Sequence, residues 1–177
     1  PIDQGQPPLR PELLRSARES GVVHKTKLLS PPGLEGKKGA KPSNYNVQFR
    51  RELGVFASVR PLKNLPGLPA RFQNVDMLVI RELTEDLYAA IEHEIVPGVV
   101  QSLKVVTESA CRRFFRFAFE WASERGRKLV HCVHKANILK MADGLFLEAF
   151  RATARDFPGL ETREIIVDNC CMQMVSK

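Results

Sequence analysis

The chain has 177 residues, 44% of them hydrophobic, which is enough for one domain with a buried core. Its net charge of +7 and pI near 9.5 fit nucleic acid, an anionic membrane face or an acidic metabolite as a partner, and charge alone does not choose among them. No apolar run approaches the roughly 18 residues that span a bilayer, so the sequence predicts no transmembrane segment.

Residues 1–43 are predicted to form a loose, basic leader. Prolines crowd residues 1–8, and residues 31–42 are rich in Pro, Gly and Lys, a composition typical of loops. Between these two stretches we expect a helix from Pro11 to Ser20 and then a strand from Val22 to Leu29.

Residues 44–177 are predicted to form an α/β domain. Val47–Leu53 has a helical pattern, and Val55–Arg60 has an extended one, followed by a loop over 61–69. The near-continuous apolar run Val75–Arg81 is typical of a strand buried on both faces.

A hairpin arm is expected at about residues 89–107. Its two extended stretches, Ile91–Val96 and Val99–Val106, are separated by Pro97-Gly98, which favours a tight turn. An arm of this kind is suited to pairing with another chain.

The last third alternates helices and strands. Apolar residues at helical spacing predict a helix from about Ala110 that ends at Gly126. Beyond it we expect a buried strand at Lys128–Val133, a helix at Met141–Phe157 and a strand at Glu164–Asp168. This order indicates a sheet with parallel members.

Four cysteines lie in apolar segments without a C-x-x-C spacing, a pattern typical of reduced thiols. They are Cys111, Cys132, Cys170 and Cys171. We therefore expect no disulfide.

Two groups of polar residues suggest a binding site. Lys135 and Asn137 follow a predicted strand and precede a predicted helix, a junction that is more often a solvated turn than an active site. Arg50, Arg60 and Arg81, with Tyr88 shortly after, suggest a pocket for a substrate that carries several carboxylates. Alternatively, Arg50 and Arg51 form a solvated helix face, Arg60 and Arg81 pair with Glu52 or Glu82, and Tyr88 simply packs.

Five segments carry a family resemblance: SNYNVQFRRELGVFASVRP, LVIRELTEDLYAAIEHE, GVVQSLKVVTE, VHKANILKMADGLFLE and IIVDNCCMQMV. They closely resemble the NAD-dependent isocitrate dehydrogenases of the β-decarboxylating dehydrogenase family. The resemblance implies a partial α/β fold of the isocitrate/isopropylmalate dehydrogenase type, with the small domain, the hairpin clasp and part of the large-domain sheet.

The resemblance also implies roles for residues of this chain. The family oxidises and decarboxylates isocitrate to 2-oxoglutarate with NAD and Mg²⁺ or Mn²⁺. Tyr88 matches the catalytic acid, and Lys135 matches a catalytic lysine that reaches in from the neighbouring subunit. Asn137 matches a cofactor contact, and Asp168 matches a metal ligand lent across the dimer. The positions that match substrate-binding residues are Asn44, Asn46, Arg50, Arg60 and Arg81.

Departures from the family pattern keep two hypotheses open. Asn44 stands where the family usually has a substrate-binding serine, and the family's cofactor loop and two further metal aspartates have no counterpart in this sequence. Either the chain is a fragment or split subunit of a mitochondrial-matrix enzyme that is inactive alone, or it is a non-catalytic structural or regulatory subunit of a larger mitochondrial assembly. Expected partners are homologous subunits through the clasp and isocitrate or citrate, with nucleic acid not excluded.

Overall fold

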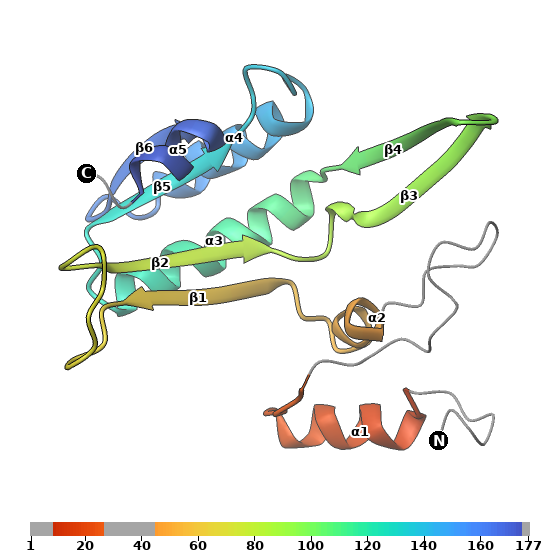
Figure 1. Ribbon diagram of the computed structural model, residues 1–177, viewed down its shortest axis with the longest axis horizontal. Coiled ribbons are helices and arrows are strands. Elements are labelled where there is room, and N and C mark those ends of the chain that lie inside the picture. The colour runs from red at the N-terminus through yellow and green to blue at the C-terminus, as the bar shows by residue number, and fades with distance from the viewer. Residues whose placement is uncertain (1–8, 27–44, 175–177) are drawn as a thin grey trace. The chain divides into compact units, whose positions relative to one another are not determined.

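The computed structural model describes residues 9–26 and 45–174 (Figure 1). The chain divides into two compact units, Pro1–Phe56 and Ala57–Lys177. Most of the expected leader, at residues 1–8 and 27–43, lies outside the described residues. Within the described ranges, no helix combines the length and the apolar character that crossing a membrane requires.

The described residues of the first unit form two helices. Helix α1 spans Pro11–Ser20 and ends at Gly21, whose φ of 66° is the left-handed conformation that glycine adopts without steric cost. This confirms the predicted helix. The strand expected after it is wrong for residues 22–26, which have no regular structure, while residues 27–29 lie outside the described part. Helix α2 spans Tyr45–Glu52, close to its predicted bounds.

The second unit begins with an antiparallel strand pair. Strand β1 spans Ala57–Lys63 and pairs with β2, Asp76–Glu82. The prediction that the second strand is buried on both faces is wrong, because its middle residues are only half-buried and its one described partner is β1. The predicted loop also begins later, since β1 continues through Pro61 to Lys63.

Strands β3 (Asp86–Val96) and β4 (Val99–Val105) form the predicted hairpin, which projects beyond the N-terminal end of α3 in Figure 1. Its tight turn contains Gly98, with a φ of 84°. The pairing is irregular at the start of β3, where a register shift separates Asp86 from Ile91. Large apolar side chains are exposed along both strands: Leu87, Ile91, Ile95, Val96, Val99, Val100 and Leu103.

The remaining elements form the core of the second unit. In chain order they are α3 (Glu108–Glu124), β5 (Leu129–His134), α4 (Ala142–Ala154), β6 (Glu161–Ile166) and α5 (Val167–Gln173). Strands β5 and β6 are parallel, as the alternation of helices and strands predicted. Rings from α3 and α4 pack together, with Phe119 fully buried and Phe150 nearly so.

Two expectations for this region are wrong. Strand β5 is not buried throughout, because only Cys132 within it is fully enclosed. The strand expected at Glu164–Asp168 ends at Ile166. Its partner β5 ends at His134, which pairs with Ile166, so β5 has no residue left to pair with the following positions. Asp168 therefore lies in the first turn of α5, where the helix dipole favours an acidic side chain.

Candidate functional site

Two of the predicted substrate residues share one face of α2. Asn46 and Arg50 are four positions apart, so their side chains lie one helical turn from each other. Arg50 is half-buried, and Asn46 Oδ1 accepts a hydrogen bond of 2.8 Å from Lys25 Nζ. Asn44 lies outside the described residues.

Three further predicted residues come together on the β1–β2 ladder. Ser58 is directly opposite Arg81, and Arg60 is two positions along β1, so both arginines project from the same face. Arg60 Nε donates to Ser58 Oγ at 3.2 Å, which confirms that these side chains share a face. The Arg81 guanidinium lies 5.4 Å from the centre of the Tyr88 ring.

The alternative pairing of Arg81 with Glu82 does not form. Adjacent residues of a strand point to opposite faces, and the Glu82 carboxylate instead accepts hydrogen bonds from the backbone of the next turn. These bonds come from Thr84 N at 2.9 and 2.8 Å and from Glu85 N at 2.9 Å. The acid beside Arg81 thus shapes the turn that leads to Tyr88.

A second acid ties this turn to helix α3. The Glu85 carboxylate accepts from Thr107 N at 2.8 Å and from Thr107 Oγ1 at 2.6 Å, and Thr107 is the N-cap of α3. Tyr88 N also donates to Glu85 O at 3.1 Å. The backbone that carries Tyr88 is therefore fixed to the core through Thr107.

Lys135 and Asp168 form the other pair that the structure brings together. Lys135 follows β5, Asp168 begins α5, and their side chains form an ion pair although they are 33 positions apart. The hydrogen bond from Lys135 lowers the pKa of Asp168 below its ordinary value. Asn137 is exposed in the turn two residues after Lys135, so the expected strand–turn–helix setting of both residues is confirmed.

The loop that carries Lys135 is closed by its own backbone. Lys135 O accepts hydrogen bonds from Ile138 N at 3.0 Å and from Leu139 N at 2.9 Å. Lys135 N in turn donates to Asp143 Oδ2 at 2.6 Å. Each backbone polar group of Lys135 is thus bonded, which holds its side chain at the edge of the parallel strand pair.

Sequence reasoning missed Asp143 and its partner Lys104. Asp143 is buried in the first turn of α4 and pairs with Lys104 Nζ from the hairpin at 2.5 Å. Burial acts to lower the pKa of Lys104, but Asp143 and Asp86 together outweigh it and raise that pKa. The sequence contains only a weak indication of a role for Asp143, because an acidic residue in the first turn of a helix is usually explained by the helix dipole alone.

A divalent cation needs several ligands held close together. Within the described ranges, no three His, Cys, Asp or Glu side chains are grouped so that they would hold a metal. Asp168 is a single carboxylate with 68% of its side chain exposed. Since Mg²⁺ sites use several oxygen ligands, the described part of this chain does not form a complete cation site, and Asp168 would supply one ligand of several.

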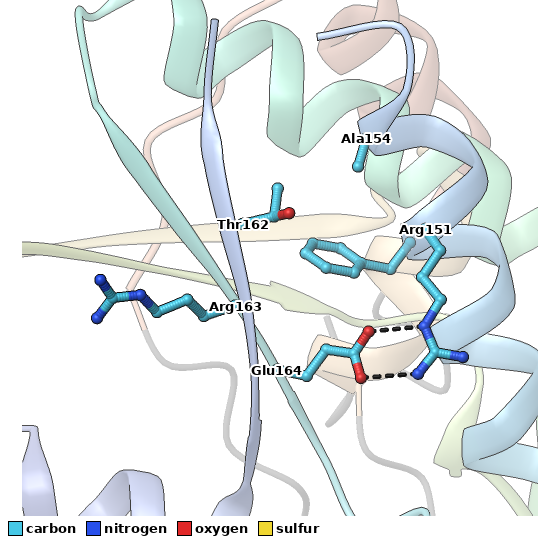
Figure 2. Close-up of a pocket in the computed structure, with 6 residues that line it drawn as sticks. Arg151, Ala154, Thr162, Arg163 and Glu164 are labelled. Atoms are coloured by element: carbon cyan, nitrogen blue, oxygen red, sulfur yellow. Dashed lines mark hydrogen bonds and ion pairs between the residues drawn. The ribbon is translucent and has the colours of Figure 1, made fainter. Parts of the chain in front are cut away.

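A surface hollow of about 400 Å³ lies between α4 and β6, and none of the predicted site residues lines it. Its lining includes Arg151 and Glu164, which face each other in Figure 2 and form two hydrogen bonds of 2.7 and 2.8 Å. Glu164 neutralises Arg151, and Arg163, the other arginine of the lining, pairs with Glu161 at 2.6 Å, so both cations of the hollow already have an acidic partner.

Comparison with known proteins gives consistent results. A family model described as isocitrate/isopropylmalate dehydrogenase matches residues 1–177. The chain is 52% identical over 94% of its length to isocitrate dehydrogenase (NAD) regulatory subunit 1, mitochondrial, of Arabidopsis thaliana. It is 44% identical over 94% of its length to isocitrate dehydrogenase (NAD) subunit 1, mitochondrial, of Schizosaccharomyces pombe.

A solved structure agrees with these relatives. The crystal structure of isocitrate dehydrogenase from Methylococcus capsulatus matches with a TM-score of 0.85 and 39% identity, covering 99% of this chain and 51% of that one. The chain spans 44% and 45% of the two relatives' own lengths, so it corresponds to less than half of each. The fold is that of part of an α/β isocitrate/isopropylmalate dehydrogenase.

Proposed function

Because the chain belongs to the isocitrate/isopropylmalate dehydrogenase family, and within it to the NAD-dependent isocitrate dehydrogenase subunits, we propose that it contributes a tricarboxylate-binding surface to such an enzyme. The observation that carries the proposal is the convergence of Arg60, Arg81 and Tyr88. Two guanidinium groups on one face match the paired carboxylates of isocitrate or citrate.

The positions of these groups suggest how they would act. The forked donors of Arg60 and Arg81 would each bind a carboxylate and orient the substrate beside the Tyr88 ring. The Arg81 cation lies over that ring, and this contact would hold the Tyr88 hydroxyl beside the bound substrate, where it can act as a proton donor. In this proposal Tyr88 delivers a proton to the carbon that loses carbon dioxide.

Lys135 and Asp168 would take part in the same reaction, at the edge of the β5–β6 strand pair. Their ion pair keeps the lysine ammonium oriented and the carboxylate charged. Lys135 would handle the proton of the substrate hydroxyl, and Asp168 would supply one oxygen ligand to Mg²⁺ or Mn²⁺, which when bound polarises that hydroxyl. Asn137 would lie against NAD.

A regulatory role is the second candidate, and a specific observation favours it. The Arabidopsis thaliana relative at 52% identity is named a regulatory subunit. Asn44 also departs from the serine that the family resemblance leads one to expect. In this version the arginine surface binds citrate or isocitrate without turnover and alters the activity of a homologous catalytic subunit.

Both versions require partner subunits and share a location. The exposed apolar side chains of the β3–β4 hairpin would be covered by a homologous subunit. Since the relatives are named as mitochondrial subunits, we propose that the chain functions in the mitochondrial matrix, with its homologues or within a larger mitochondrial complex.

The test is calorimetric titration of isocitrate and of citrate into the complex that contains this chain. Arg60→Ala and Arg81→Ala should each weaken binding about tenfold to a hundredfold, because each removes a charge-assisted contact. Arg112→Ala is the matched control, since within the described part of the chain the acid that Arg112 pairs with is Glu108, one turn away on α3. Binding that is unchanged in both variants would overturn the proposal.

Tyr88→Phe separates the two versions. A catalytic role predicts unchanged tricarboxylate affinity and a fall in kcat of about a hundredfold or more. A regulatory role predicts that kcat at saturating isocitrate stays near that of the wild type, with the citrate dependence of KM altered only by the arginine variants. Steady-state kinetics of the assembled complex with each variant decides between them.

A further inference from the structure

Lys104 occupies an unusual place between two acidic side chains. It lies near the base of the hairpin, in β4, and its Nζ is 2.5 Å from Asp143 Oδ1 and 3.3 Å from Asp86 Oδ2. The Lys104 side chain is 22% exposed, and that of Asp143 only 6%. An ammonium so enclosed is held in one position by its two carboxylates, unlike an ordinary surface lysine.

One of these carboxylates holds the Lys135 loop. Asp143 uses one oxygen for Lys104 and the other for the backbone N–H of Lys135, at 2.6 Å. Its side chain therefore transmits the position of Lys104 to the backbone of Lys135. A buried carboxylate that lost its ammonium partner would rotate toward water or another donor, and the bond to Lys135 N would weaken.

The other carboxylate holds the turn before Tyr88. Asp86 has a φ of 60°, in the left-handed region that non-glycine residues rarely adopt. Its Oδ1 accepts from Leu87 N at 2.7 Å, while its Oδ2 faces Lys104. Anchoring at both oxygens stabilises a backbone conformation that would otherwise cost free energy, two residues before Tyr88.

We propose that Lys104 is a positioning residue that couples the Tyr88 turn to the Lys135 loop. A change at either loop shifts the ammonium, and the ammonium shifts the carboxylate of the other loop. Coupling between two loops needs a continuous chain of contacting side chains, and Asp86, Lys104 and Asp143 provide one. The functional meaning of the coupling rests on the proposed function, because only there do Tyr88 and Lys135 act on substrate.

The test measures hydrogen exchange at single amides by NMR in the intact chain. Asp86→Asn is the informative variant, because asparagine keeps an acceptor for Leu87 N and removes the charge that faces Lys104. It should speed exchange of the Lys135 amide about tenfold, although residue 135 is 49 positions away in the sequence. Faster exchange only at residues 86–88 would overturn the coupling and leave a local structural role.

Substitutions at Lys104 provide the second arm. Lys104→Met should speed exchange of the Lys135 amide about tenfold to a hundredfold, and Lys104→Arg should restore most of the protection, since it returns a cation to the same place. Lys63→Met is the matched control, because Lys63 forms a comparable ion pair of 3.0 Å with Asp76 in the same unit. An equal effect from Lys63→Met would overturn the proposal.

A double substitution tests whether both loops act through one lysine. Asp86→Asn and Asp143→Asn together should change Lys135 exchange by less than the product of the two single effects, whereas independent sites would multiply. If the two single effects on the exchange rate of the Lys135 amide multiply in the double variant, the proposed coupling is wrong. None of these measurements uses substrate, so a failure of the proposed function leaves them intact, and a failure here leaves the tricarboxylate titration intact.

Discussion

The helical core of the second unit and its β3–β4 hairpin are similarly rich in apolar residues but use them in opposite ways. Helices α3 and α4 direct their rings at each other, and Phe119 contacts both Phe150 and Phe157. The hairpin exposes its aliphatic side chains, with Val100 63% exposed. Apolar content alone therefore does not tell whether a segment stabilises its own chain or awaits another one.

The strongest way to test this contrast is to remove a ring from the core. Phe119→Ala should lower the free energy of unfolding by about 3 to 5 kcal/mol, because Phe119 is fully buried and its loss leaves a cavity. Urea denaturation monitored by circular dichroism measures the change. Phe72→Ala is the control at a ring that is 39% exposed, and an equal loss there would contradict the assignment of the core.

The pH dependence of stability reports on the same core through Cys132. Burial, aided by the negative charges of Glu164 and Asp143, raises the pKa of Cys132 to about 12. In the unfolded chain the thiol ionises near its ordinary value, so above that pH the unfolded state loses a proton that the folded state retains. Stability from Cys132 is complete below about pH 8.5 and should fall by about 1.4 kcal/mol per pH unit above it.

Cys132→Ala isolates this contribution. The wild-type slope of unfolding free energy against pH should be steeper than that of the variant between pH 9 and 11. Cys171→Ala, at an exposed free thiol, should keep the wild-type slope. Identical slopes in the wild type and Cys132→Ala would show that the thiol is accessible to water.

The helices and the hairpin were predictable because their signals are local. The three- and four-residue spacing of apolar side chains fixed α3, and Pro97-Gly98 located the hairpin turn at Gly98. The setting of Lys135 between a strand and a helix was equally visible, since it depends on neighbours in sequence. None of these local signals indicates which other segment of the chain a helix, strand or side chain will contact.

The wrong or missing predictions for Asp168, Lys104 and Asp143 depend on contacts with residues far away in the sequence. The strand predicted over Glu164–Asp168 does not reach Asp168, because β6 ends where its partner β5 ends. Lys104 and Asp143 are 39 positions apart and look like two solvated charges until the fold pairs them. Contacts between distant residues carry no periodicity, so only the structure finds them.

Relieving backbone strain at the base of the hairpin should change the stability of the chain by a smaller amount. Ala90 has a φ of 53°, within the irregular stretch between Asp86 and Ile91, where an alanine side chain is disfavoured. Ala90→Gly should stabilise the chain by about 0.5 kcal/mol, the relief of strain being partly offset by the greater freedom of glycine in the unfolded state. Thermal unfolding measures it, with Ala89→Gly as the control that should only destabilise.

The smallest effect on the chain itself is expected at the tip of the hairpin. Val100→Ala should change the unfolding free energy by less than about 0.5 kcal/mol, because the side chain is mostly exposed and little burial is lost. If a homologous subunit covers this strand, the same substitution removes buried area from the interface and weakens association about tenfold. Sedimentation velocity over a concentration series detects that shift, while a large loss of stability in the monomer would mean that the hairpin packs on its own chain, like α3 and α4.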